Sequence, residues 1–171
     1  MEDAELIRAV KLFYDDIRRF AYASCKNFFD AEDITQNVFL KLSKYDGVFD
    51  NDVHLKNWLV SVTKNESTSL LRSSWKKKVD FYTPEQVRDT NITTTEHPYL
   101  KEALLGLKQK YREAIFLFYF EEYNVREIAE ILNIKQNTVL KRLERARLQI
   151  KKYIYEKEKN FKSCCLEEVV R

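Results

Sequence analysis

The feature that most constrains this chain is a stretch near its C-terminus, residues 124–147, whose apolar pattern predicts two helices separated by a short turn. Asn124 precedes Glu127 by three residues, which is the spacing of a capping box at a helix start. Asn133 is expected to end this first helix in a left-handed conformation, which asparagine tolerates well. The buried face of the first helix is expected to comprise Val125, Ile128, Ala129 and Leu132.

The second helix, expected to start near Gln136, has one apolar and one basic face. At 100° per residue, the apolar face consists of Val139, Leu143, Ala146 and Ile150. The opposite face carries Lys141, Arg145 and Lys152, and the polar side chains of Asn137 and Thr138 lie at the N-terminal tip. Such a helix fits a DNA major groove, where amides read adenine and basic side chains read guanine or hold phosphate. A solvated basic face on an ordinary helix is less favoured, because this face coincides with the turn and the polar tip.

Composition limits the class of protein. Among 171 residues there are only two Gly and two Pro, and the helical periodicities are long, so we expect an almost wholly helical chain. The net charge of +3 is small, yet residues 135–152 contain seven basic residues and one acid, which indicates a local nucleic-acid contact. No signal peptide and no long apolar run is evident, and three cysteines form no disulfide framework, so we expect a cytoplasmic protein with reduced thiols.

The N-terminal half begins with an amphipathic helix or helix pair over residues 3–29. A helix is then expected from Asp30, with a buried stripe of Ile34, Val38 and Leu42. Phe39 and Leu40 lie off this stripe, so we expect them to be partly exposed. Exposed apolar side chains indicate a protein-binding face, although a wide core stripe explains the pattern equally well. The polar residues beside this pair are Asp33, Gln36 and Asn37.

Residues 45–54 form an expected loop with Phe49 at its centre, followed by a helix from about Leu55 to Arg72. The expected buried side of this helix is Trp58, Leu59, Val62 and Leu70. Its polar side mixes cationic, amide and hydroxyl groups, namely Lys56, Lys64, Asn65, Ser69 and Arg72. Such groups beside an aromatic loop suit single-stranded or unstacked bases. The run Lys76–Lys78, taken alone, is better explained as a solvated helix end.

Residues 79–98 contain both prolines, carry net negative charge and lack apolar periodicity. We therefore expect two small helical domains, 1–78 and 99–155, joined by this acidic flexible linker and followed by a tail, 156–171. The second domain is expected to contain four helices, including the helix-turn-helix.

Taken together, these segments resemble, in order, the two-domain sigma factors of bacterial RNA polymerase of the extracytoplasmic-function (ECF) type, in the sigma-70 superfamily. Residues 30–42 resemble the core-polymerase-binding helix, and residues 58–65 with 70–72 resemble the promoter-melting helix. Residues 110–113, 127–130 and 137–147 match the upstream-element reader. The sequence departs from the usual family residues at Ser69 (Asp), Lys108 (Pro), Asn133 (Gly) and Lys135 (Ser).

The resemblance implies a role for each candidate residue. The clamp helices of the polymerase's largest subunit would bind Asp33, Gln36, Asn37, Phe39 and Leu40, and the flap region is a further expected contact. The duplex −35 element would be read by Gln136, Asn137, Thr138, Lys141, Arg142 and Arg145. A flipped −10 base and the opened strand would be held by Phe49, Lys56, Asn65 and Arg72. Free sigma factors are commonly held by an anti-sigma partner, and no residue here identifies one.

Enzymatic alternatives find little support in the residues. His54 and His97 lie in expected loops without ligand spacing, and two glycines build neither a phosphate loop nor a nucleophile elbow. We therefore expect no catalytic residue, metal or cofactor. Two non-enzymatic rivals remain: a dimeric helix-turn-helix regulator acting without polymerase, and a protein that only binds polymerase or another protein. The melting-type helix beside an aromatic loop favours the sigma factor, because a dimerisation domain has no need of it.

Overall fold

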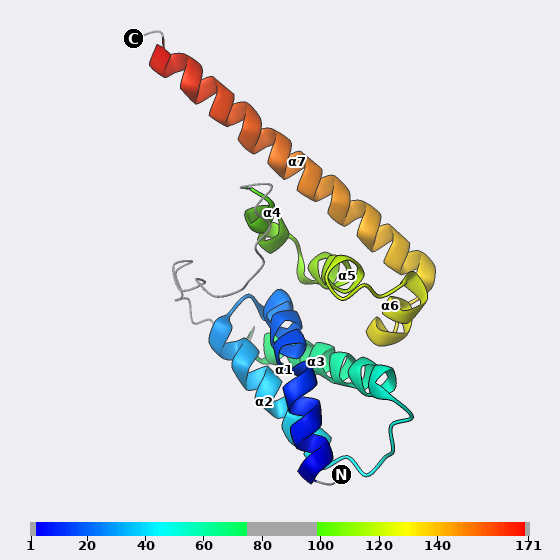
Figure 1. The fold of residues 1–171 in the computed structure, drawn as a ribbon. Coiled ribbons are helices and arrows are strands. Elements are labelled where there is room, and N and C mark those ends of the chain that lie inside the picture. The colour runs from blue at the N-terminus through cyan, green and yellow to red at the C-terminus, as the bar shows by residue number, and fades with distance from the viewer. Residues whose placement is uncertain (1–2, 75–98, 170–171) are drawn as a thin grey trace.

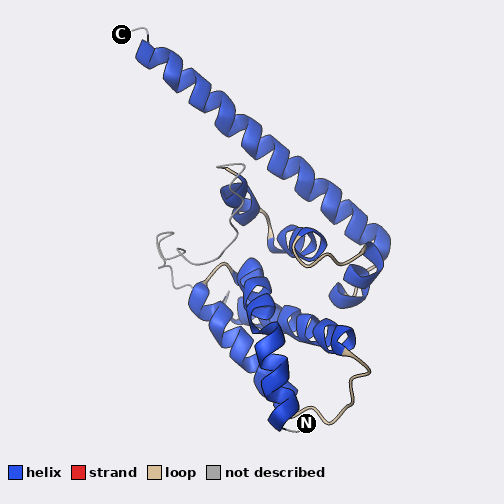
Figure 2. Cartoon of the chain, in the orientation of Figure 1, coloured by secondary structure: helices blue, strands red, loops and turns tan. Residues whose placement is uncertain are grey.

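The computed structural model describes residues 3–74 and 99–169, and these residues form seven helices and no strand (Figure 2). This confirms the expectation of an all-α protein with a group of helices on either side of residues 75–98. The linker 79–98 and the run Lys76–Lys78 lie outside the described residues. The helices are α1 Asp3–Cys25, α2 Phe28–Ser43, α3 Asp52–Ser74, α4 Leu100–Gly106, α5 Gln109–Tyr119, α6 Val125–Leu132 and α7 Gln136–Val169 (Figure 1).

Helices α1 and α2 meet at a sharp corner. Lys26 has a φ of 63°, which ends α1, and the side chain of Asn27 then caps α2 by accepting a hydrogen bond from the backbone N–H of Asp30 at 3.1 Å. The second helix therefore starts at Phe28, two residues before the expected Asp30. The N-cap explains the difference. The sequence interpretation assigned no N-cap residue to this helix, whereas in the structure the side chain of Asn27 caps it and the helix can start one residue later.

The apolar stripe of α2 is wider than expected. Ile34, Val38 and Leu42 are buried as predicted, but Phe39 is only 8% exposed and stacks on Tyr14 of α1 with 6.0 Å between ring centroids. The expectation of partial exposure was therefore wrong for Phe39. It is confirmed for Leu40, which is 57% exposed.

In the second domain, α4 and α5 are joined through Leu107 and Lys108. Lys108 has φ −62° and ψ 144°, and Leu107 has φ −63° and ψ 148°. These are the angles that a proline and its preceding residue adopt. Lys108 thus has the backbone conformation that the family's usual proline would impose at this position.

Replacing Lys108 by proline is therefore expected to raise the free energy of unfolding by about 0.4–1 kcal/mol, because proline restricts only the unfolded chain at this position. Urea denaturation would measure the change. Lys110→Pro is the matched control. Lys110 lies one residue inside the start of α5, so the residue before the new proline is helical, a conformation that proline disfavours in its preceding residue. An equal or larger gain from the control would contradict this explanation.

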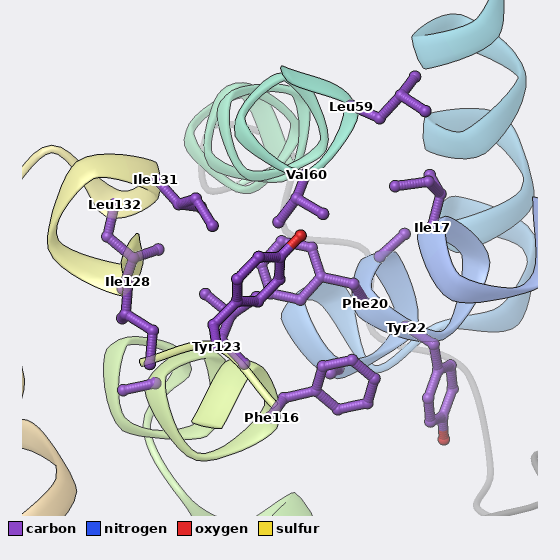
Figure 3. Close-up of a cluster of buried hydrophobic side chains, with 14 of the residues drawn as sticks. Ile17, Phe20, Tyr22, Leu59, Val60, Phe116, Tyr123, Ile128, Ile131 and Leu132 are labelled. Carbon is purple, nitrogen blue, oxygen red and sulfur yellow. The ribbon is translucent and has the colours of Figure 1, made fainter. Parts of the chain in front are cut away.

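The two groups of helices share one continuous core. Residues 20–24 of α1 are all buried, because α2 and α3 cover one side of this segment and α5 covers the other. Figure 3 shows Phe20 and Val60 of the first domain converging with Phe116, Tyr123 and Ile131 of the second. The rings of Phe20 and Phe116 lie 5.8 Å apart. The domains are thus packed together in this structure.

Candidate nucleic-acid interface

The helix-turn-helix has the local geometry that its sequence predicts. Asn124 accepts hydrogen bonds from the backbone N–H groups of Arg126 and Glu127, and the Glu127 carboxylate accepts one from Asn124 N–H at 2.8 Å. Asn133 adopts φ 51° and ψ 55° in the left-handed region. Ile134 N–H then donates to the Ala129 carbonyl at 2.9 Å and closes the helix end. The capping box and left-handed turn are both confirmed.

Helix α7 presents the two faces expected from its periodicity. Val139, Leu143 and Ala146 are fully or almost fully buried against α5 and α6. The six residues predicted to contact the −35 element lie on the first three turns, and none of them is buried. Exposed are Gln136, Asn137, Lys141 and Arg145, while Thr138 and Arg142 are half-buried.

One candidate reader, Arg145, is linked to the rest of the domain. The interaction of its guanidinium with the hydroxyl of Tyr111 on α5 is the main cause that lowers the pKa of that phenol. A long arginine side chain loses much rotamer freedom on binding, and a fixed partner reduces that loss. Tyr111 is thus a neighbour of Arg145 that favours one region of space for its guanidinium.

The expected −10 surface starts at the loop between α2 and α3. Phe49 is half-buried there, with its ring 5.0 Å from Tyr45, 5.4 Å from His54 and 5.7 Å from Trp58. A hollow of about 720 Å³ lies beside it, lined by residues 45–52 and by Glu5, Arg8 and Leu55. Arg8 holds Asp52, at the start of α3, through bonds of 2.6 and 2.7 Å. The loop thus combines aromatic and polar groups around one opening.

Helix α3 divides the other −10 candidates between opposite faces. Asn65 and Arg72, seven residues apart, share one exposed face of the helix. Lys56 lies about 180° away at 100° per residue and is half-buried. Its ammonium is 2.9 Å from Asp16 of α1 and 2.8 Å from Glu121 of the second domain. The structure therefore does not bring the four candidates together.

Comparison with known proteins supplies the deciding observation. The family model for sigma-70 region 2 matches residues 9–77, and that for sigma-70 region 4 matches residues 98–150. The RNA polymerase sigma factor SigV of Bacillus subtilis is 30% identical over 84% of this chain and 87% of its own length. The ECF RNA polymerase sigma factor SigW of the same organism is 29% identical over 85% of this chain and 86% of its own. This chain belongs to the ECF sigma factors.

Solved structures agree on the fold. The sigma factor RpoE in complex with the anti-sigma factor NepR, from Bartonella quintana, superposes with a TM-score of 0.74. It is 22% identical, and the match covers 88% of this sigma factor and 97% of RpoE. Within residues 3–74 and 99–169, this sigma factor has no helix with the length and apolar character needed to cross a membrane.

Two further surfaces of this sigma factor expose polar or apolar groups. Four of the five candidates on α2 are exposed, namely Asp33, Gln36, Asn37 and Leu40. The fifth candidate, Phe39, is buried. On the second domain, a groove of about 730 Å³ runs between α4, α5 and α7, and sequence reasoning missed it. Its apolar lining includes Leu100, Leu104, Ile115, Phe120, Ile150 and Ile154.

Sequence reasoning also missed the residues that join the two domains. Ile131 was not placed on the buried stripe of α6, yet it is only 6% exposed, because α6 packs on α3. Arg112 is 5% exposed and donates hydrogen bonds to the carbonyls of Ala23, Ser24 and Leu107. Burial is the main cause that lowers its pKa. The signal available in the sequence was its spacing, since Arg112 precedes Ile115 and Phe116 by three and four residues and so shares their apolar face of the helix.

Proposed function

We propose that this ECF sigma factor, which directs promoter-specific initiation by core RNA polymerase, divides promoter recognition between the first turns of α7 and the α2–α3 region. The observation that carries this proposal is the helix-turn-helix: a capped support helix, a left-handed turn, and a second helix whose exposed face is polar at the tip and basic beyond it. This arrangement fits a recognition helix in the major groove.

For the −35 element, Asn137 is suited to bidentate contact with adenine, and Lys141 with guanine or phosphate. Arg145, whose guanidinium interacts with the hydroxyl of Tyr111, would contact guanine or phosphate one turn further along. The surrounding contacts to bases and phosphates would come from Gln136, Thr138 and Arg142.

For the −10 element, we assign the strand contact to the exposed face of α3 that carries Asn65 and Arg72. The hollow beside Phe49 would receive an unstacked base, because aromatic side chains can stack on any base and the polar loop groups can bond to its edge. Lys56 would contact the strand only after its ion pairs with Asp16 and Glu121 break.

For polymerase, we assign the exposed polar face of α2 to the clamp helices and the α4–α5–α7 groove to an apolar element of the flap region. A groove with this lining suits the apolar side of a helix. The protein would act in the cytoplasm as a subunit of the holoenzyme, and the catalytic groups would be those of core polymerase.

Replacing Asp33 and Leu40 together by alanine is expected to weaken binding to core polymerase by about tenfold or more, because the pair loses an exposed charge and an apolar anchor. Fluorescence titration of labelled protein with core polymerase would measure it. The matched control is Leu12→Ala with Asp15→Ala, which removes the same two side-chain types from an exposed face of α1. Equal weakening by the control pair would contradict the assignment of α2.

A further inference from the structure

The loop between α2 and α3, at the periphery of the first domain (Figure 1), is anchored at both ends. At its start, the Tyr45 N–H donates a hydrogen bond to the Leu42 carbonyl at 3.0 Å, which ties the loop to the end of α2. At its end, the side chain of Asn51 accepts a hydrogen bond from the His54 N–H at 2.9 Å and caps α3. Only the few residues between these two anchors are therefore free to choose their conformation.

Aromatic rings brace this short segment. The ring of Tyr45 lies 5.0 Å from the ring of Phe49 and 4.9 Å from that of Trp58 on α3, and all three side chains are half-buried. Ring pairs at such separations stabilise a contact beyond the area that they bury. Gly47 leaves the space that this arrangement needs, because a Cβ there would come within 2.5 Å of the end of the Tyr45 ring. The loop thus has a defined shape in which Tyr45 and Phe49 pack toward α3.

The same shape leaves Val48 exposed. Its side chain is 86% exposed, more than any other large apolar side chain in residues 3–74 and 99–159. Single exposed apolar residues are common on protein surfaces and need no explanation. Val48, however, lies between braced neighbours and lines the hollow beside Phe49. An apolar side chain held at a cavity by a rigid support is typical of a contact site.

The charge around Val48 indicates which part of DNA it would contact. Asp46 and Asp50, two residues before and after it, are both exposed. Contacts to the DNA backbone come mainly from basic side chains, and carboxylates repel phosphate. The tip of this loop therefore suits the bases, which are uncharged. Apolar side chains contact bases most effectively where they enter a stack and separate two neighbours.

We propose that Val48 is an apolar wedge that enters the base stack of the −10 element beside the unstacked base, and that Tyr45, Phe49 and Trp58 are its positioning residues. The proposal rests on the function assigned above, in which the hollow beside Phe49 receives that base. Val48 would replace the stacking contact that the neighbouring base loses. The loop would then have two separable tasks, since Val48 assists the opening of the duplex and the hollow holds the base once it has left the stack.

Two promoter templates separate these tasks. In the first, a duplex promoter fragment found by run-off transcription carries 2-aminopurine in the −10 element, and the fluorescence of this base rises when it unstacks. With core polymerase bound, Val48→Ser is expected to slow opening by about tenfold, because serine replaces little of the lost stacking contact. In the second template the −10 element is mismatched and already unpaired, and Val48→Ser should there give transcripts at the rate of the unmodified protein. Val53→Ser, at a 61% exposed valine in the first turn of α3, should match the unmodified protein on both templates.

Unchanged opening of the duplex by Val48→Ser would overturn the wedge. An equal loss on both templates would also overturn it, because the defect would then lie in holding the base and not in opening the duplex. If the unmodified protein with core polymerase opened no promoter, the proposed function itself would be refuted, and Val48 would have no such role.

A pair of glycine variants tests the brace. Gly47→Ala should displace the Tyr45 ring from its contacts and slow the opening of the duplex template. Gly106→Ala makes the same change in α4, where nothing lies within 4 Å of the added Cβ, and should leave the opening rate unchanged. Equal opening rates for the two variants would overturn the assignment of Tyr45 as a positioning residue.

Discussion

Replacing Arg112 by methionine is expected to lower the free energy of unfolding by about 3 kcal/mol. The variant leaves three buried carbonyls without their donor, those of Ala23, Ser24 and Leu107, and bonds from a charged donor are worth about 1.5–3 kcal/mol each. Burying the arginine cation costs desolvation free energy, and methionine, which has a similar length and no charge, avoids that cost. This saving offsets part of the loss. Chemical denaturation followed by circular dichroism would measure the change.

Arg126→Met is the matched control, because the Arg126 side chain is 78% exposed and bonds only to Glu130 among the side-chain contacts described. We expect it to change stability by less than about 0.5 kcal/mol. Two of the three carbonyls belong to α1, so Arg112→Met should also make the two domains unfold less cooperatively. A loss no greater than that of the control would show that the buried guanidinium contributes little.

Replacing Lys141 by alanine is expected to weaken binding to −35 duplex DNA by about 1–3 kcal/mol, or roughly five- to 150-fold in dissociation constant. Lys141 is exposed on the second turn of α7, one turn from Asn137, so its removal should not disturb the buried face formed by Val139 and Leu143. Fluorescence anisotropy with a labelled promoter duplex, at one fixed salt concentration, would measure the affinity.

The control for Lys141 lies on the same helix. Lys152 is also exposed, and eleven residues place it within about 20° of Lys141 but roughly 16 Å further along the axis. Lys152→Ala should leave the −35 affinity within a factor of about two, since one distant surface charge contributes little. If both variants weakened binding equally and at every sequence tested, α7 would contribute only general charge attraction.

The helix-turn-helix could be predicted from the sequence because local rules determine it. The capping box of Asn124 and Glu127, the left-handed Asn133 and the apolar face of α7 each depend on residues within a few positions of one another. Capping, turn chemistry and helical periodicity all operate over that range. The exposed, basic face opposite Val139 followed from the same periodicity.

The remaining features depend on residues far apart in the chain. Phe39 is buried because Tyr14, on another helix, covers it. Ile131 is buried because α6 packs on α3, and Lys56 meets Glu121 across 65 positions. A pattern along one helix indicates which residues share a face but not which element covers that face. The domain contact and the division of the −10 candidates therefore required the structure.

The most direct test of the account is run-off transcription by bacterial core RNA polymerase supplied with this purified sigma factor, using sheared genomic DNA of the source organism as template. We predict discrete transcripts that core polymerase alone does not make, and their loss when Lys141→Ala or Asp33→Ala with Leu40→Ala is used. Absence of any new transcript, together with tight binding of the free protein to duplex DNA, would contradict the account and indicate a regulator that acts without polymerase.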